Sequence, residues 1–458
     1  MDVIIAIKLG ISHTSNVCMI NYYQPKDCEE FNVVFDTKSN TQLQTTSVTT
    51  PTVTLFDDKG AIQSYGFEAE IQSKKLDNES NHLLFREFIW DLFCSDEKLP
   101  ENLNAVNGRQ MKSIDVMAAV LGYMISHIKT EAVFQGLPLT LKYVLTIPTC
   151  ACKGSRTFMT EAALKAGCSR ENIKIVEEAA AILLFCLHDK QHTGVTTLDD
   201  DTCNRKYFVV ECEEDNAAIS VLTYTNENMI EILYTDNAEI WKDGHILNDF
   251  IEIISLNTRK ALLDFFEKYP MEYYNFLQEV KTKLRLTSSD CSKLYLNISS
   301  VMLEEKRCSE SMQEAVLGTE RKDELKFIGD KCVIKSERFQ ILFTEAGRRI
   351  VDYIEKELFD VFADINHIIL VGEFAQSPIL QDIIKTSFSA KNIIIPCEGN
   401  ITAVRGAVLL GQRSISVGKK IVHTMNHTPL NNAQVVLTEG ERIEINKKKS
   451  PRKRCVII

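Results

Sequence analysis

The residues with the clearest chemical meaning lie at two strand–turn–strand segments, 2–22 and 206–225. A turn between two strands can bind phosphate when glycines let backbone N–H groups converge on its oxygens. A carboxylate at the end of such a strand can hold a hydrated Mg²⁺. Here the first turn follows a lysine and the second turn is acidic throughout. The candidate residues of the two turns are Lys8, Gly10, Ser12, Glu211, Glu213, Glu214 and Asp215.

The elements around these turns alternate between strands and helices, which predicts an α/β protein. In the first half, strands are expected at 2–8, 16–22, 31–36, 142–148 and 172–176, a hairpin at 51–67, and helices at 79–94, 113–135 and 153–166. In the second half, strands are expected at 206–212, 217–225, 293–299 and 367–372 and at NIIIP, and helices at 244–267, 271–286, 336–361, 378–388 and 401–412.

A pair of strands opens each half, so the pattern predicts two related lobes with a mixed sheet in each. The expected divisions are 1–198 for lobe I, 199–415 for lobe II with a returning C-terminal helix, and 416–458 for a polar and basic tail. A ligand of such a protein would bind in the cleft where the two opening turns face each other.

Composition excludes several classes of protein. With 458 residues, 45% of them hydrophobic, the chain can bury substantial cores, and its net charge of −11 argues against a general nucleic-acid binder. No apolar run is long enough to span a membrane and the N-terminus lacks signal-peptide features, so we expect a cytoplasmic protein with reduced cysteines. The paired histidines at 188/192 and 423/427 have no third ligand nearby, and we predict no metal site there.

Several motifs in the same order over about residues 3–415 resemble the actin-like ATPase domain of the 70-kDa heat-shock protein family, and within it the divergent 12A/12B-like branch. They are AIKLGISHTS, TPTVTLF with SYGFEA, AVNGRQMKSIDVMAAVLGYM, VLTIPTCACKGSRTFMTEAALKAG, IVEEAAAILLFC, YFVVECEEDNAAISV, ILVGEFAQSPIL and AVRGAVLLG. The resemblance implies a two-lobed, ribonuclease H-like fold and a cleft for ATP or ADP with Mg²⁺.

The chain departs from the family where phosphate would bind. The family's first turn reads roughly D-x-G-T-T, and Lys8 takes the place of the acid. The second turn reads roughly D-x-G-G-G-T-x-D, and its three glycines are replaced by Glu213, Glu214 and Asp215. Each carboxylate about 4 Å from a phosphate oxygen would cost about 4 kcal/mol at an effective dielectric near 20. A lysine ammonium cannot ligate Mg²⁺, so no cofactor is expected unless the family site is retained.

Other family positions are partly preserved. Glu177 matches the acid that helps to place the attacking water, although an acidic first helix turn is sufficient to explain both Glu177 and Glu178 and is the favoured interpretation. The candidate adenosine-binding residues are Gly372, Glu373, Ala375, Glu279 and Lys283. A solvated charged helix face is the alternative for the last two.

We also hypothesise that Lys8 forms an internal ion pair with the 213–215 turn, where nucleotide and metal would otherwise bind. The alternative is that both turns have become ordinary solvated surface.

Three functions remain open from the sequence. The first is a scaffold or adaptor whose ATPase is lost, a pseudoenzyme with unidentified protein partners. The alternatives are an ATP-binding, chaperone-like protein that retains nucleotide binding, and a nucleotide binder without hydrolysis. Against an ordinary chaperone, about 43 residues follow the last matching helix, too few for a peptide-binding domain and lid.

The last twelve residues, KKKSPRKRCVII, combine two membrane signals. Six basic residues lie in Lys447–Arg454, and Cys455 begins a cysteine–aliphatic–aliphatic–residue pattern typical of prenylation. One lipid with a polybasic segment gives stable anchoring to an anionic leaflet. We therefore expect a prenylated Cys455 and peripheral attachment to the cytoplasmic face of a membrane; a frayed or nuclear-targeting basic tail is the alternative.

Overall fold

The structure is a computed structural model of the whole chain. It describes residues 2–11, 13–21, 28–31, 49–73, 81–94, 98–130, 140–188, 204–213, 217–236, 265–266, 268–288, 290–304, 325–399 and 401–421. The turn residues Ser12, Glu214 and Asp215, the basic tail and Cys455 lie outside these ranges.

The first lobe is built on a six-stranded mixed sheet. Its strands are β1 (Asp2–Leu9), β2 (His13–Asn21), β3 (Cys28–Phe31), β4 (Thr49–Pro51), β10 (Thr140–Ile147) and β11 (Ile173–Glu177). They lie in the order β11-β10-β1-β2-β3, with β4 also paired to β2. β1 pairs antiparallel with β2 and parallel with β10, so the turn after β1 opens at the same edge as the end of β10.

The second lobe repeats this arrangement. Its strands are β12 (Lys206–Cys212), β13 (Ala217–Thr225), β14 (Met229–Asp236), β18 (His367–Val371), β19 (Asn392–Ile394) and β20 (Ser416–Lys419). The order is β19-β18-β12-β13-β14-β20, with β12 antiparallel to β13 and parallel to β18. β20 extends this sheet into the stretch that the sequence assigned to the tail.

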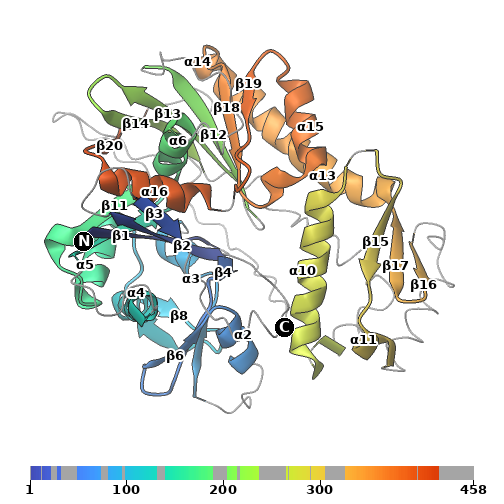
Figure 1. The fold of residues 1–458 in the computed structure, drawn as a ribbon, viewed down its shortest axis with the longest axis horizontal. Coiled ribbons are helices and arrows are strands. Elements are labelled where there is room, and N and C mark those ends of the chain that lie inside the picture. Colours follow the sequence, from blue (N-terminus) through green and yellow to red (C-terminus); the bar gives the residue numbers. More distant parts are fainter. Residues whose placement is uncertain are drawn as a thin grey trace, which may run out of the picture.

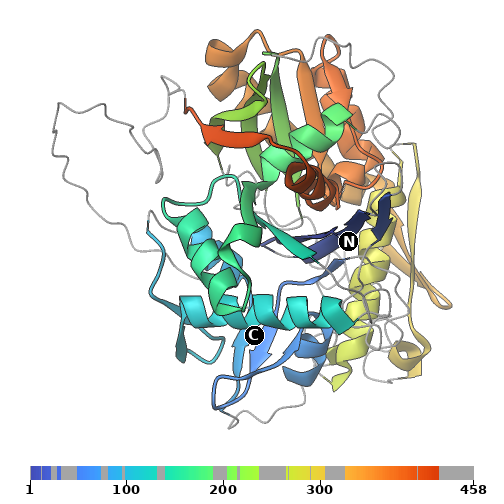
Figure 2. The same cartoon turned by 60° about the vertical axis from the view of Figure 1, so that its left-hand side comes forward.

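Two helices, α6 (Glu178–His188) and α16 (Thr402–Gln412), pack between the sheets and join the lobes (Figures 1 and 2). Their apolar residues form one core with Ile4 and Ala6 of β1 and with Tyr207 and Val209 of β12. The helices approach so closely that a Cβ on Gly406 would lie 1.8 Å from the carbonyl oxygen of Ala181. Glycine is therefore required at this crossing.

The remaining elements cover the outer faces of the sheets and extend each lobe. On the first lobe they are β5 (Thr54–Phe56), β6 (Ile62–Tyr65), α2 (Phe67–Ser73), β7 (Leu83–Phe85), α3 (Phe88–Phe93), β8 (Asn102–Asn104), β9 (Gln110–Lys112), α4 (Ser113–Thr130), α5 (Ser155–Lys165) and η2 (Arg170–Asn172).

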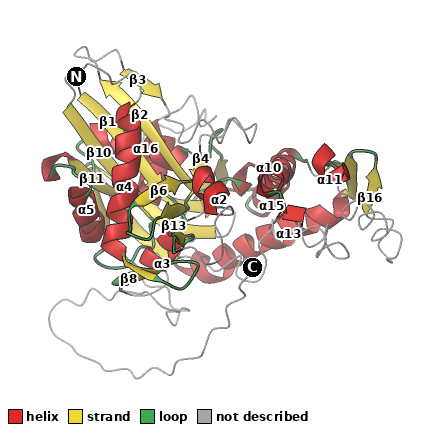
Figure 3. Ribbon diagram, turned by 90° about the horizontal axis from the view of Figure 1, so that it is seen from below, coloured by secondary structure: helices red, strands yellow, loops and turns green. Residues whose placement is uncertain are grey.

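On the second lobe they are α10 (Pro270–Leu286), β15 (Lys293–Asn297), α11 (Ser300–Glu304), β16 (Leu325–Ile328), β17 (Lys331–Lys335), α13 (Ser336–Tyr353), η4 (Ile354–Leu358), α14 (Phe359–Phe362), η5 (Phe374–Gln376) and α15 (Pro378–Ser387). The small sheet β15-β17-β16 and α11 project from the body of the molecule (Figure 3).

The predicted α/β architecture with a mixed sheet in each half is confirmed. The helix predicted at 79–94 is wrong, because residues 83–85 form β7, which pairs with β5, and the helix begins only at Phe88. The third strand ends at Phe31, and residues 32–36 lie outside the described ranges, as does nearly all of the helix predicted at 244–267. Among the described helices, none has the length and apolar character needed to cross a membrane.

Candidate functional site: an ion-paired cleft between the lobes

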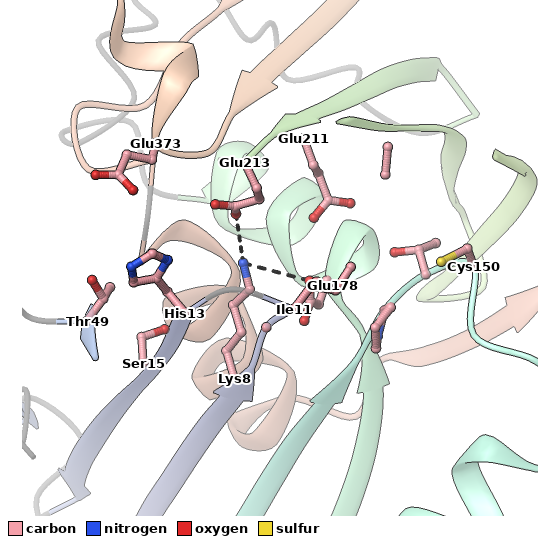
Figure 4. A pocket seen from close by; sticks show the side chains of 14 residues that line it. Lys8, Ile11, His13, Ser15, Thr49, Cys150, Glu178, Glu211, Glu213 and Glu373 are labelled. Atoms are coloured by element: carbon pink, nitrogen blue, oxygen red, sulfur yellow. Dashed lines mark hydrogen bonds and ion pairs between the residues drawn. The ribbon is translucent and has the colours of Figure 1, made fainter. Parts of the chain in front are cut away.

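A pocket lies between the lobes, where the ends of β1 and β12 meet (Figure 4). The lining side chains come from both sheets, the start of α6 and the segment after β18. They are Lys8, Gly10, Ile11, His13, Ser15, Thr49, Pro148, Thr149, Cys150, Glu178, Glu211, Glu213, Ala218 and Glu373.

Strand alternation places Lys8 and Glu211 in this pocket. Successive side chains of a strand point to opposite faces. Lys8 follows Ile4 and Ala6 on the face of β1 that turns toward the second lobe, and Glu211 follows Tyr207 and Val209 on the matching face of β12. The two apolar faces thus form the core between the lobes, and each ends in one charged residue at the cleft.

The ammonium of Lys8 is paired with acids from the other lobe and from α6. Its Nζ donates to Glu213 Oε1 at 3.0 Å and lies 3.8 Å from Glu178 Oε2. Lys8 is only 7% exposed, so the pair is shielded from water on the lysine side. The predicted ion pair between Lys8 and the acidic turn is therefore present, through Glu213.

The protonation of the cluster follows from its charges. Burial alone would favour a neutral amine, but the carboxylates of Glu213, Glu178 and Glu211 raise the pKa of Lys8 well above its ordinary value. Burial would raise the pKa of Glu213, yet Lys8, the charge of His13 and the backbone N–H of Glu373 lower it. Lys8 and Glu213 are therefore both charged near neutral pH.

The other two acids are held in a more protonated state. Burial, the charge of Glu178 and, to a smaller extent, that of Glu213 raise the pKa of Glu211 to about 8, although Lys8 opposes the shift. Burial also raises the pKa of Glu178, which accepts a hydrogen bond from Thr146 Oγ1 at 3.3 Å. A cluster with one cation and several closely spaced carboxyl groups can take up a proton near neutrality.

Glu177, the predicted residue for placing water, does not line the pocket. Its carboxylate makes a two-pronged ion pair with Arg156, which also donates to the Ile175 carbonyl at 3.0 Å. The acid that faces the cleft is Glu178, the first residue of α6. The sequence reads Glu-Glu there, and only the end of β11 decides which side chain turns inward.

The candidate adenosine residues divide into two groups. Gly372 has φ +102°, and a Cβ there would lie 2.3 Å from the Cys212 carbonyl oxygen, so this glycine allows the segment after β18 to pass close to β12. Glu373 lines the pocket, and Ala375 is fully buried in η5.

Glu279 and Lys283 form the second group, on α10. Glu279 accepts hydrogen bonds from the backbone N–H of Asn297 at 3.2 Å and from its side chain at 2.7 Å, and lies 3.8 Å from Lys283. These contacts join α10 to β15. Glu279 therefore has a structural role, which the alternative of a solvated charged helix face did not predict.

Two features of the site were missed from the sequence. Neither Glu178 nor Cys150 was predicted from the sequence as a residue of the cleft. The alternation of side chains along a strand, counted from Ala6 and Val209, would have placed Lys8 and Glu211 on the inward faces. A loop residue such as Cys150 has no such alternation, so the sequence cannot locate its side chain. Among the residues that the structure describes, no three or more His, Cys, Asp or Glu side chains are grouped as metal ligands.

The lobes, the repeated sheets and the cleft between the two opening turns define a two-lobed, actin-like ATPase fold. Similarity to known proteins agrees with this class. Over 432 residues, 79% of this chain, it is 22% identical to heat shock 70 kDa protein 12A of Mus musculus and, equally, of Homo sapiens. Over 154 residues, 31% of the chain, it is 33% identical to heat shock 70 kDa protein 12B of Homo sapiens.

The chain spans 63% of the length of the two 12A proteins, and its match to the 12B protein spans 22% of that protein. No protein-family model matches the chain. The similarity supports a distant relation to the 70-kDa heat-shock protein-like family, whose actin-like fold is a nucleotide-binding one, and no finer assignment.

Proposed function

We propose that this chain is a non-hydrolysing member of the 12A/12B-like branch, a scaffold or adaptor whose lobes are held by internal charge instead of by nucleotide and metal. The observation that carries the proposal is the contact of the buried Lys8 Nζ with the half-buried Glu213 Oε1 at 3.0 Å. An ammonium at this position supplies a positive charge to the cleft but offers no oxygen ligand for Mg²⁺.

The surrounding acids support the same conclusion. Glu178, Glu211, Glu213 and Glu373 all line the pocket. A triphosphate placed beside the ionised carboxylate of Glu213 would meet like charge, at about 4 kcal/mol for a pair separated by about 4 Å at an effective dielectric near 20. It would also have to displace the ion pair of Lys8 and leave its partners buried without a counter-charge.

A second candidate function is nucleotide binding without hydrolysis. It is favoured by Gly372, whose positive φ and close contact with Cys212 preserve the backbone path that the family uses beside adenosine. Such binding would depend on the base and ribose, and Mg²⁺ would contribute nothing to it.

Titration calorimetry with ATP and ADP, with and without Mg²⁺, tests both candidates, and a phosphate-release assay measures hydrolysis. We expect no Mg²⁺-dependent binding and no phosphate release above that of a buffer blank. Glu227→Gln, in the exposed β13–β14 turn, serves as the control variant.

Mg²⁺-dependent binding at micromolar ATP, abolished by Lys8→Asp but not by Glu227→Gln, would refute the proposal. Binding of equal strength with and without Mg²⁺ would instead select the second candidate.

A further inference from the structure

Two cysteines from different segments of the first lobe meet at the wall of the cleft. The sulfur atoms of Cys94 and Cys150 lie 3.5 Å apart in a thiol–thiol hydrogen bond. Cys94 follows the last residue of α3, and Cys150 lies in the loop after β10. The two segments are also joined by the backbone N–H of Cys152, which donates to the Phe93 carbonyl at 3.1 Å.

We propose that Cys94 and Cys150 form a reversible disulfide when the protein meets a peroxide. A disulfide needs its sulfur atoms at about 2.05 Å, so the present contact has to shorten by about 1.5 Å, which small side-chain rotations can supply. The backbone hydrogen bond between Cys152 and Phe93 already holds the two segments together. The bond would therefore form without a rearrangement of the lobe.

The accessibility of the two thiols sets the order of the steps. Cys94 is buried, whereas Cys150 is partly exposed and lines the pocket, where a small oxidant can reach it. The Cys150 sulfur attacks hydrogen peroxide, an S–O bond forms as the O–O bond breaks, and one water leaves.

The Cys94 sulfur then attacks the resulting Cys150 sulfenic acid, the S–S bond forms as the S–O bond breaks, and a second water leaves. Two thiols are oxidised by two electrons, and one peroxide is reduced to two waters. The thiol–thiol hydrogen bond and burial raise the pKa of Cys150, so the first step is slow at neutral pH and responds to sustained exposure.

The loop of Cys150 is also a contact between the lobes. Lys419 of β20, in the second sheet, donates through Nζ to the Thr149 carbonyl at 3.0 Å and reaches the Ala151 carbonyl at 3.5 Å. A disulfide to Cys94 would pull on this loop at the residue between those two carbonyls. Oxidation would thus act on the wall of the cleft, at a residue that lies next to one inter-lobe contact.

The direct test is to expose the whole chain to hydrogen peroxide, block the remaining thiols with N-ethylmaleimide, and map peptides by mass spectrometry without reduction. We expect a Cys94–Cys150 cross-link that dithiothreitol removes. Cys397, which is exposed, reports that oxidant has reached the protein. The proposal is overturned if Cys397 is oxidised while Cys94 and Cys150 are both recovered as maleimide adducts, or if either is joined to another cysteine.

Variants test the order of the steps. Cys94→Ser should let Cys150 sulfenic acid accumulate and be trapped by dimedone, and Cys150→Ser should leave Cys94 reduced. The matched control is Cys152→Ser, whose side chain is buried beside Ser155, and which should form the cross-link as the unaltered chain does.

A second readout is the Tm of the unaltered chain, so it does not depend on whether a variant folds. Closing a loop between residues 56 positions apart should raise the Tm of the oxidised unaltered chain, and dithiothreitol should reverse the rise. A cross-linked protein whose Tm is unchanged or lower would show a strained bond instead, and would overturn the inference that the site is prepared for it.

Discussion

Replacing Lys8 by methionine removes the cation of the cleft and keeps a side chain of similar length. At an effective dielectric near 20, the attraction is about 5.5 kcal/mol to Glu213 at 3.0 Å and about 4.4 kcal/mol to Glu178 at 3.8 Å. Much of this offsets the cost of burying the ammonium, and removing one partner of a buried pair generally costs about 3–5 kcal/mol. Because the side chain of Glu213 is 25% exposed and Glu178 can take up a proton, we expect the lower end of that range.

The assay is urea unfolding followed by circular dichroism at pH 7, from which the free energy of unfolding is obtained. The matched control is Lys206→Met, since Lys206 pairs with Asp364 at 2.8 Å on the surface, where an ion pair contributes about 0–1 kcal/mol. Adding Glu213→Gln to Lys8→Met should recover part of the lost stability, because it removes the unpaired carboxylate. If Lys8→Met costs no more than Lys206→Met, the ion pair does not stabilise the cleft and the reasoning fails.

Two further substitutions test the cleft and the junction of the lobes. The folded-state pKa of Glu211, about 8, lies above the ordinary value of 4.5, so the contribution of this group to stability is present below pH 4.5 and is lost as the pH rises through 8. Glu211→Gln should therefore match the unaltered chain near pH 5 and be the more stable near pH 9. Glu227→Gln, in an exposed turn, is measured under the same conditions as the control. Parallel stability curves for the unaltered chain and Glu211→Gln would contradict the shift. Gly406→Ala should destabilise the protein by several kcal/mol, because the added methyl group collides with the neighbouring helix. Gly122→Ala, whose added methyl group would have its nearest neighbour 3.9 Å away, should stabilise the protein by up to about 1 kcal/mol. Thermal unfolding measures the change in Tm of both variants, and a stabilising Gly406→Ala would contradict the close helix contact.

The core of the fold could be predicted because its signals are local. Strand β12 was predicted with the bounds that the structure gives, and the hairpin at 51–67 appears as β5 and β6. Period-two alternation and turn residues are carried by the sequence itself. The helix predicted at 79–94 failed because pairing between β7 and β5 overrides the helical periodicity of its first half.

The cleft could be predicted in charge but not in detail. Lys8 opposite an acidic turn follows from the resemblance of both strand pairs to one fold, and an ion pair with some residue of the 213–215 turn was hypothesised on that basis. The choice between Glu177 and Glu178 depends on where β11 ends and α6 begins, a boundary that sequence patterns locate only to within a few residues. The meeting of Cys94 with Cys150 depends on how two loops pack, which no local pattern encodes.

The repetition of the two sheets explains why Lys8 faces acids of the second lobe across the cleft. Lys8 and Glu211 occupy equivalent positions, because each is the last inward residue of the strand that opens its sheet. Since both sheets have the same strand arrangement and face each other, these two positions meet at the cleft. Lys8 gives the first lobe a positive charge at the cleft and Glu213 gives the second lobe a negative one, so the two lobes attract each other through this contact. On the proposed function, the protein would then keep one relative arrangement of its lobes, which suits a surface that partners recognise better than a cycle of opening and closing.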